Sequence, residues 1–170
     1  MLIAPEPYQL RPLQLEDLEA VYVIERLSLP TPSKKGVYQH ELTQNQLAHY
    51  QALTGNGRNL IGYSGFWQIA DEAHISIIAV HPDWRGQGLG ELLLLNLLFV
   101  ACEQQLASVM LEVRRSNTIA QALYLKYAFE IVGERRRYYS NGEDALLMTA
   151  VLACDTLPEK QKHLFSRWQK

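Results

Sequence analysis

The chain has 170 residues, a formal net charge of −2 at pH 7 and 48% hydrophobic residues. These values fit one globular domain and exclude a disordered or collagen-like chain. The slightly acidic balance also argues against a protein whose main task is to grip nucleic-acid phosphates, so direct nucleic-acid binding is not expected.

The cysteine content and the apolar stretches of the sequence indicate the cellular compartment in which the protein works. Two cysteines, Cys102 and Cys154, are too few for a disulfide framework, and we expect one small core residue and one incidental thiol. Residues 1–7 lack a basic flank followed by an apolar core, so no signal peptide is expected. The most apolar stretch, 92–102, is shorter than the roughly 20 residues that a membrane span needs. We therefore expect a protein of the reducing cytoplasm with no membrane association.

Hydrophobic periodicity divides the first half of the chain into six elements. They are, in chain order, a strand from Tyr8 to about Pro12, a helix at 15–27, a second helix at 36–47, and strands at 48–54, 60–69 and 74–80. The first helix must end within Leu29–Ser33, because proline cannot continue it. The Asn56-Gly57 pair favours a hairpin between the first two of the three strands.

Helices and strands alternate in the second half. The pattern predicts a helix at 89–106, a strand at 109–113, a helix from an N-cap at Ser116-Asn117 to about 127, and strands at 129–132 and 144–152. Residues 1–152 would form the domain. The tail, 153–170, could form a short amphipathic helix with Leu164, Phe165 and Trp168 on one face. Hairpins first and crossovers later predict an α/β (α+β) fold, a mixed sheet with helices on both faces.

A glycine-rich loop, Arg85-Gly86-Gln87-Gly88-Leu89-Gly90, separates a predicted strand from a predicted helix. Glycine lets a backbone approach a ligand closely, and the N–H groups at a helix start favour an anion such as pyrophosphate. A Walker loop is excluded because no lysine follows Gly90. Two other interpretations of this segment remain: a plain strand-to-helix turn and a dinucleotide-binding loop. The second has the weaker fit, because the spacing is Gly-x-Gly-x-Gly and five residues precede Gly86 after the strand.

The loop resembles the acetyl-coenzyme A loop of the GNAT superfamily, Gln/Arg-x-x-Gly-x-Gly/Ala, at Arg85, Gly88 and Gly90. The segments on either side, 80–84 and 117–124, are also similar to motifs of that superfamily. Within it, one group fits more closely: the RimI family, bacterial enzymes that acetylate the N-terminal alanine of a small-subunit ribosomal protein. That similarity rests on three short segments, 111–117, 136–139 and 143–148.

The resemblance implies a GNAT-type, mostly antiparallel central sheet, acetyl-CoA as co-substrate and a protein N-terminus, that of a ribosomal protein, as acceptor. It assigns the pantetheine arm to backbone groups of Ile78, Ala79 and Val80. The pyrophosphate is assigned to Arg85, Gly86, Gln87, Gly88, Leu89 and Gly90, and a further cofactor contact to Asn117.

Amide formation from an amine and a thioester needs a base for the amine and an acid for the departing thiolate. Glu112 lies in an otherwise apolar strand, where a carboxylate is unfavourable unless it has a function. The resemblance assigns Glu112 the role of general base. The pattern alone also allows a strand-end acid in water, paired with Arg114. By helical spacing Tyr124 would be a core residue, whereas the resemblance makes it the acid.

The α-amino group of a protein is an easier nucleophile to generate than a lysine side chain. Its ordinary pKa is about 7.7–8.0 against about 10.4, so deprotonation is roughly 3.4 kcal/mol easier. One carboxylate is then an adequate base, which permits an N-terminal substrate. A lysine or small-amine substrate and a catalytically silent acyl-CoA-binding module stay open.

Some residues depart from the family pattern or imitate other motifs. Leu29–Ser33 has no aromatic residue where RimI relatives usually carry one, which leaves peptide specificity open. Ala128 replaces the usual glycine, which would cost about 1–2 kcal/mol in a left-handed conformation. His40-Glu41 begins a zincin motif, but Gln44 stands where the second histidine is required, so no metal is expected. The arginines at 135–137 fit a solvated face, or contacts to coenzyme phosphates or ribosomal RNA.

Overall fold

The computed structural model describes residues 1–34, 36–55, 57 and 59–161. Within these ranges a seven-stranded sheet has the order β1-β2-β3-β4-β5-β7-β6. The strands are β1 (Tyr8–Pro12), β2 (Ala48–Gly55), β3 (Asn59–Ile69), β4 (Glu72–Val80), β5 (Ser108–Arg114), β6 (Glu130–Arg135) and β7 (Ala145–Val151). Neighbouring strands are antiparallel except β4 and β5, which run parallel. The predicted mixed, mostly antiparallel sheet is confirmed.

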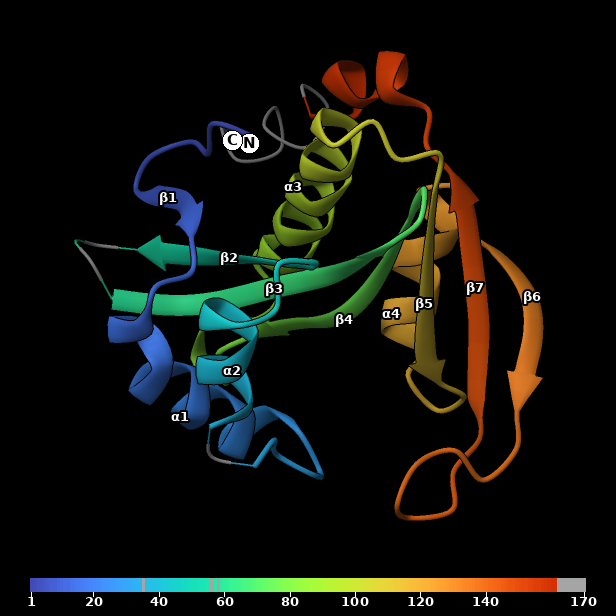
Figure 1. Cartoon of the computed structure of the whole chain (residues 1–170), viewed down its shortest axis with the longest axis horizontal. Coiled ribbons are helices and arrows are strands. Elements are labelled where there is room, and N and C mark those ends of the chain that lie inside the picture. The colour runs from blue at the N-terminus through green and yellow to red at the C-terminus, as the bar shows by residue number, and fades with distance from the viewer. Residues whose placement is uncertain (35, 56, 58, 162–170) are drawn as a thin grey trace.

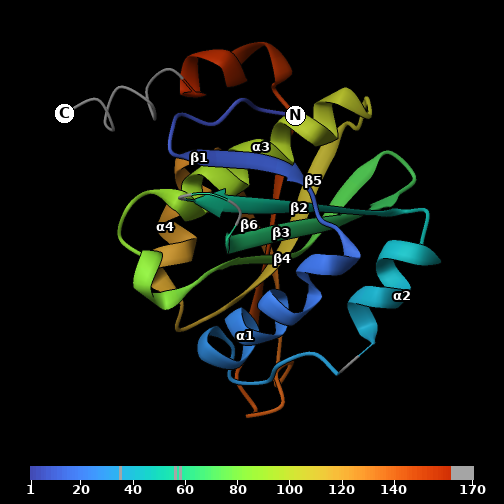
Figure 2. The same ribbon diagram turned by 90° about the vertical axis from the view of Figure 1, so that its left-hand side faces the viewer.

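Helices cover both faces of this sheet, as predicted (Figures 1 and 2). They are α1 (Leu18–Ser28), α2 (Val37–Thr43), α3 (Leu89–Glu103) and α4 (Thr118–Lys126), with short 3-10 turns at Leu15–Asp17, Pro82–Trp84 and Cys154–Thr156. One hydrophobic core joins α3 and α4 to their face of the sheet, and a second joins α1 and α2 to the other. Among the described helices, none is long and apolar enough to cross a bilayer.

Helix α3 is the most buried of the described helices. The side chains of Leu92, Leu93, Leu94, Leu95 and Asn96 are all inaccessible to solvent. A helix that is apolar all round needs partners on every side. The sheet covers one side, and α4, the N-terminal residues and the segment after β7 contribute to the same core (Figure 1). Buried Asn96 accepts the backbone N–H of Leu2 at 3.0 Å, which holds the first residues on α3.

Several element boundaries differ from the prediction by two or more residues; α3, for example, ends at Glu103 rather than at residue 106. Helix α2 ends at Thr43 rather than near residue 47, because the side chain of Asn45 accepts the N–H of Leu47 at 3.1 Å and forms a turn. Strand β6 continues to Arg135, three residues further than its apolar run. Pairing with β7 extends it, since Arg135 lies opposite Ala145.

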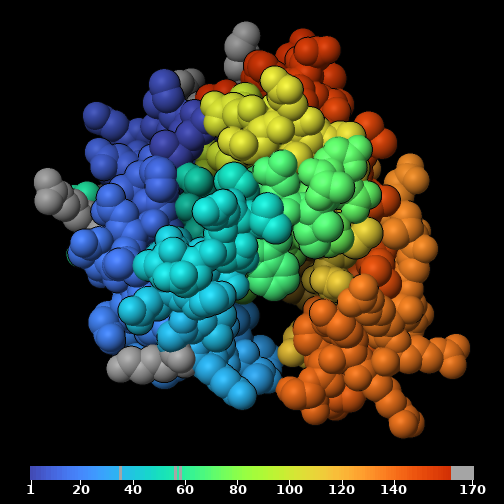
Figure 3. All heavy atoms as spheres, in the orientation of Figure 1, coloured from blue at the N-terminus to red at the C-terminus, as the bar shows by residue number. Residues whose placement is uncertain are grey.

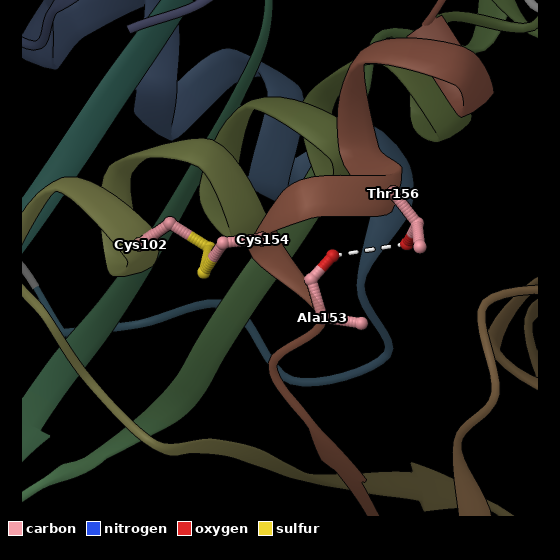
Figure 4. The surroundings of a disulfide bond; sticks show 4 residues. All are labelled: Cys102, Ala153, Cys154 and Thr156. Atoms are coloured by element: carbon pink, nitrogen blue, oxygen red, sulfur yellow. Dashed lines mark hydrogen bonds between the residues drawn. A yellow bond between two sulfur atoms is a disulfide. The ribbon is translucent and has the colours of Figure 1, made fainter.

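The expectation for the cysteines is wrong, because Cys102 and Cys154 form a disulfide (Figure 4). Cys102 lies near the end of α3, and Cys154 starts the turn after β7. The bridge ties the C-terminal segment to α3, and Leu157 is buried in the same core. Helical backbone continues at 157–161, whereas the predicted amphipathic face at 164–168 lies outside the described residues.

Helix α4 ends in a Schellman motif, in which Phe129 N donates to the carbonyl of Tyr124 and Ala128 N to that of Leu125, both at 3.1 Å. Ala128 has φ +63°, the left-handed conformation that glycine adopts most easily. The ring of Phe129 packs on the ring of Tyr124 with centroids 5.6 Å apart. The motif therefore also fixes the position of Tyr124.

Reduction of the disulfide should destabilise the fold. The bridge joins residues 52 positions apart, and opening a loop of that length costs roughly 4 kcal/mol of unfolding free energy in the chain-entropy model. Urea unfolding with and without dithiothreitol measures the difference. Cys154→Ser should match the reduced wild type and show no further response to the reductant. A wild-type midpoint that ignores the reductant would contradict this expectation.

Ala128→Gly should raise the free energy of unfolding by about 1 kcal/mol, because it removes the left-handed strain of a residue with a Cβ. The matched control is Ala122→Gly at an exposed interior position of α4, which should lower it by about 1 kcal/mol. Denaturant unfolding of both variants gives the two signs. Equal destabilisation by both substitutions would show that residue 128 carries no such strain.

Candidate active site

Strands β4 and β5 separate in the middle of the sheet. Their pairing begins at Glu72 opposite Ser108 and ends at Ile75 opposite Leu111, although both strands continue (Figure 1). On its other side, β4 skips one residue against β3, which makes Ser76 a β-bulge at the point of separation. A bulge bends its strand. The divergence leaves the β4 edge from Ser76 to Val80 without a strand partner on the β5 side.

A cavity of about 520 Å³ opens where the strands diverge, a size typical of small-molecule sites. Its walls come from five parts of the chain. They are Ile75–Ile78 of β4, Leu111–Arg114 of β5, Asn117 with Tyr124 of α4, and two loop segments, Leu29–Thr31 and Tyr138–Ser140. Figure 3 shows the hollow between the green residues of the β3–β4 region and the orange residues after β6.

Glu112 is the first residue of β5 beyond the last pair with β4, and it lines the cavity. Its Oε1 lies 3.0 Å from Nη1 of Arg135, and its side chain is 26% exposed. The alternative in which Glu112 pairs with Arg114 is therefore wrong. Arg114 instead lies 2.9 Å from Glu143. Strand order explains the difference, because β7 brings β6 and Arg135 to the side of β5.

Tyr124 lines the same cavity from α4. Burial, with a smaller contribution from the nearby Tyr139, raises the pKa of Tyr124 to about 12. Its hydroxyl makes no hydrogen bond to any described residue. At neutral pH it is therefore a protonated donor with no acceptor in the described part of the chain. Asn117, the expected helix N-cap, also lines the cavity, and its Oδ1 accepts the N–H of Ala120 at 3.2 Å.

Glu143 anchors the wall that sequence reasoning left out of the site. Its Oε1 accepts Ser116 Oγ at 2.6 Å and Ser116 N at 2.9 Å, and its Oε2 accepts Nη1 of Arg114 at 2.9 Å. The Arg114 guanidinium lies 3.7 Å from the centre of the Tyr139 ring. The wall at Tyr138–Ser140 is thereby fastened to the end of β5. The resemblance to the family at 136–139 is the sequence signal that could have identified this wall as part of the site.

The glycine loop continues beyond β4, and its residues do not line the cavity. Ile78 lies at the cavity, while Ala79 and Val80 extend the strand toward the loop. Gly86 and Gly88 have φ of +77° and +80°, which favours glycine, and a Cβ added at Gly86 would meet open space.

Helix α3 begins at Leu89, so the N–H groups of its first turn are available at the loop. The Leu89 side chain is buried, so it offers only its backbone, and a Cβ added at Gly90 would meet nothing within 4 Å. Two other side chains brace the loop. Arg85 Nε donates to the Val80 carbonyl at 3.1 Å, and Gln87 Oε1 accepts the Tyr8 hydroxyl at 3.1 Å. In the described ranges, no three His, Cys, Asp or Glu side chains gather to hold a metal ion.

The Glu143 network should make stability depend on acid pH. Hydrogen bonds from Ser116, then from Arg114, lower the pKa of Glu143 to about 2 from an ordinary 4.5. The folded state therefore holds the carboxylate ionised. Its contribution is fully present above about pH 4.5 and is lost as the pH falls toward 2. Glu143→Gln should flatten the fall in thermal midpoint between pH 4.5 and 2.

The control for this pH profile is Glu130→Gln, an exposed carboxylate on β6. It should leave the acid limb of the curve as steep as in the wild type. An acid limb that stays equally steep in Glu143→Gln would show that the network does not form.

Comparison with known proteins shows which family the chain is similar to. Residues 13–129 match the profile of the acetyltransferase (GNAT) family. The chain is 43% identical over 139 residues to a Bacillus subtilis (strain 168) protein, covering 81% of this chain and 91% of that protein. That protein is provisionally named a [ribosomal protein bS18]-alanine N-acetyltransferase. The [ribosomal protein bS18]-alanine N-acetyltransferase of Escherichia coli (strain K12) is 35% identical over 139 residues, covering 80% and 92%.

Structural similarity agrees. The crystal structure of the ribosomal-protein-S18-alanine N-acetyltransferase from Escherichia coli matches with a TM-score of 0.78 and 33% identity, covering 85% of this chain and 94% of that one. The profile match spans more than half of the described chain, and the curated relatives exceed 30% identity over most of their length. The chain therefore belongs to the GNAT family of acetyltransferases.

Proposed function

We propose that the chain transfers an acetyl group from acetyl-CoA to the N-terminal α-amino group of a protein, namely the N-terminal alanine of ribosomal protein bS18. The observation that carries this proposal is the meeting of Glu112 and Tyr124 in one cavity at the divergence of β4 and β5. The names of the relatives supply the acceptor, because a relative at 35% identity is a bS18-alanine N-acetyltransferase.

The open edge of β4 and the glycine loop suit acetyl-CoA. Backbone groups of Ile78, Ala79 and Val80 would bond the pantetheine arm, since the β5 side of this edge has no strand partner. The pyrophosphate would lie against 85–90, where two glycines have positive φ and the first turn of α3 offers N–H donors. Asn117 would contact the cofactor at the cavity. The acetyl group would then reach the cavity at the point of divergence.

Glu112 would act as the general base. It accepts a proton from the α-ammonium of the substrate, and the freed nitrogen lone pair attacks the thioester carbonyl carbon. As the C–N bond forms and the C–S bond breaks, negative charge moves first to the carbonyl oxygen and then to sulfur. The attacking nitrogen then carries one proton more than the amide needs, and this proton passes to the sulfur, so that the coenzyme leaves as the free thiol. Backbone N–H groups at the β4 edge stabilise the oxygen. The ion pair with Arg135 uses Oε1 of Glu112, which leaves Oε2 for the amine.

Tyr124 would stabilise the leaving sulfur by donating a hydrogen bond. Its pKa of about 12 keeps the hydroxyl protonated throughout the neutral range. A thiol has a pKa of about 8.5, so complete proton transfer from Tyr124 to a thiolate is about 5 kcal/mol uphill. A donated hydrogen bond that strengthens as charge develops on sulfur avoids this cost.

A cytoplasmic location follows from the proposed acceptor, since ribosomal proteins are made and assembled there. Disulfides rarely persist in the cytoplasm, because glutathione and thioredoxin keep thiols reduced. In that compartment the working protein would carry Cys102 and Cys154 as a dithiol pair, held adjacent by the packing of the C-terminal segment on α3.

The activity test uses a peptide that begins Ala-Arg-Tyr-Phe-Arg and follows thiol release from acetyl-CoA. Glu112→Gln should lower kcat/KM by roughly 100-fold, the scale of lost general-base catalysis, and Tyr124→Phe by at least about tenfold. Both variants should bind acetyl-CoA as the wild type does. Glu130→Gln, at an exposed site on β6, should have wild-type activity.

Control substrates separate the alternatives. Blocking the N-terminus of the peptide should abolish turnover. Turnover of a blocked peptide with a free lysine, or of a small amine, would point to a different acceptor. Tight acetyl-CoA binding without any turnover would indicate a silent binding module. A thermal shift with NAD larger than that with acetyl-CoA would favour a dinucleotide site.

A further inference from the structure

Glu25 is a carboxylate buried completely in α1, where the other buried positions, Val21 and Ile24, are apolar. A buried carboxylate is costly unless donors occupy its oxygens. Glu25 does not line the cavity, and the proposed reaction does not use it. A role other than catalysis must therefore account for a carboxylate at this buried position.

Four hydrogen bonds converge on the Glu25 carboxylate. Its Oε1 accepts the Tyr38 hydroxyl at 2.7 Å, Ser33 Oγ at 2.8 Å and the Tyr63 hydroxyl at 3.1 Å. Its Oε2 accepts the backbone N–H of Ser33 at 2.8 Å. Burial raises the pKa of both tyrosines, so their hydroxyls stay protonated. Two donors come from the core and two from one residue of the loop after α1.

Glu25 holds both ends of a short segment of that loop, Leu29–Ser33, here called the wall segment. Its backbone carbonyl accepts the N–H of Leu29 at 2.8 Å, while its side chain holds Ser33. Few conformations satisfy both attachments, and Pro30 and Pro32 restrict the backbone between them further. One residue thus fixes the start and the end of the wall segment.

The wall segment bounds the cavity opposite the loop after β6. Leu29, Pro30 and Thr31 line the cavity, and Thr31 Oγ1 lies 2.9 Å from Oγ of Ser140 on the other wall. Figure 3 shows this lower part of the hollow, with blue residues on one side and orange residues on the other. A peptide N-terminus entering here would contact the wall segment before its amine reached Glu112.

We propose that Glu25 is a positioning residue for the peptide substrate, which acts by holding the wall segment against the first residues of the incoming N-terminus. The inference rests on the proposed function and adds to it the residue that shapes peptide recognition. Leu29 and Pro30 present apolar surface, which suits a small apolar first side chain. The acetyl-CoA residues at 85–90 make no hydrogen bond to Glu25, so its loss should affect the peptide and not the cofactor.

The test compares three variants by steady-state kinetics with the alanine-initiated peptide. Glu25→Ala removes all four bonds and should raise the peptide KM at least tenfold, with kcat and the acetyl-CoA KM within threefold of wild type. Glu25→Gln keeps an oxygen for Ser33 N, and its amide can donate to the hydroxyls, so its peptide KM should stay within threefold. Val21→Ala is the matched control, equally buried on the same helix, and should change neither KM.

A second measurement does not depend on activity. In hydrogen exchange the Ser33 amide should exchange at least tenfold faster in Glu25→Ala than in the wild type, and Val21→Ala should leave it protected. If Glu25→Ala does not fold, Ser33→Ala replaces it, because this change removes one bond at a half-buried loop position. The peptide KM of Ser33→Ala should rise about fivefold, outside the threefold range that counts as unchanged.

The outcomes separate the two proposals. An unchanged peptide KM in folded Glu25→Ala, or in Ser33→Ala where the first does not fold, overturns the positioning role while the proposed function stands. An equal rise in Val21→Ala assigns the effect to general destabilisation and also overturns it. A wild-type protein that acetylates no peptide overturns the proposed function, and the positioning role with it.

Discussion

The end of hydrogen bonding between β4 and β5 is the constraint on which the rest of the structure depends. The two strands share four residue pairs and then diverge, so the β1–β4 and β5–β7–β6 parts of the sheet meet along a short seam. Helix α3 compensates, because its apolar side chains join one core with residues of both parts, among them Leu53, Phe66, Leu111 and Met148. The burial of most of α3 against both parts allows the sheet to open, and the opening provides a cavity and a free strand edge in the same place.

The loops around the opening are fastened by a repeated arrangement. Glu25 and Glu143 each accept both the backbone N–H and the hydroxyl of one serine, Ser33 and Ser116 respectively. In each case a charged acceptor takes up donors of a loop that secondary structure leaves unpaired. The two carboxylates hold opposite walls, so the space between them is set by hydrogen bonds within the protein and is formed before a substrate arrives. Preformed walls reduce the ordering that binding would otherwise require.

Local patterns in the sequence predicted most of the fold. Hydrophobic periodicity located every helix and strand, because most of them bury apolar side chains, and the bounds of α2 and β6 differ where a side-chain turn or strand pairing decides them. Local patterns could not predict which distant residues meet in the fold. Arg135 reaches Glu112 through the order β5-β7-β6, which does not follow the chain, and Cys154 meets Cys102 across 52 positions. The motif similarity identified cavity residues such as Asn117 and Tyr124, but the structure was needed to show the loops that face them.

The wall segment restricts its backbone without an aromatic residue. An aromatic residue would give this segment rigidity by filling space, and none is present between Leu29 and Ser33. Here two prolines and the bonds to Glu25 restrict the backbone instead. Rigidity that comes from the backbone leaves more room beside the wall than a large ring would. Selectivity for a first residue would then depend on where the wall stands, and a carboxylate that never touches the substrate would set that position.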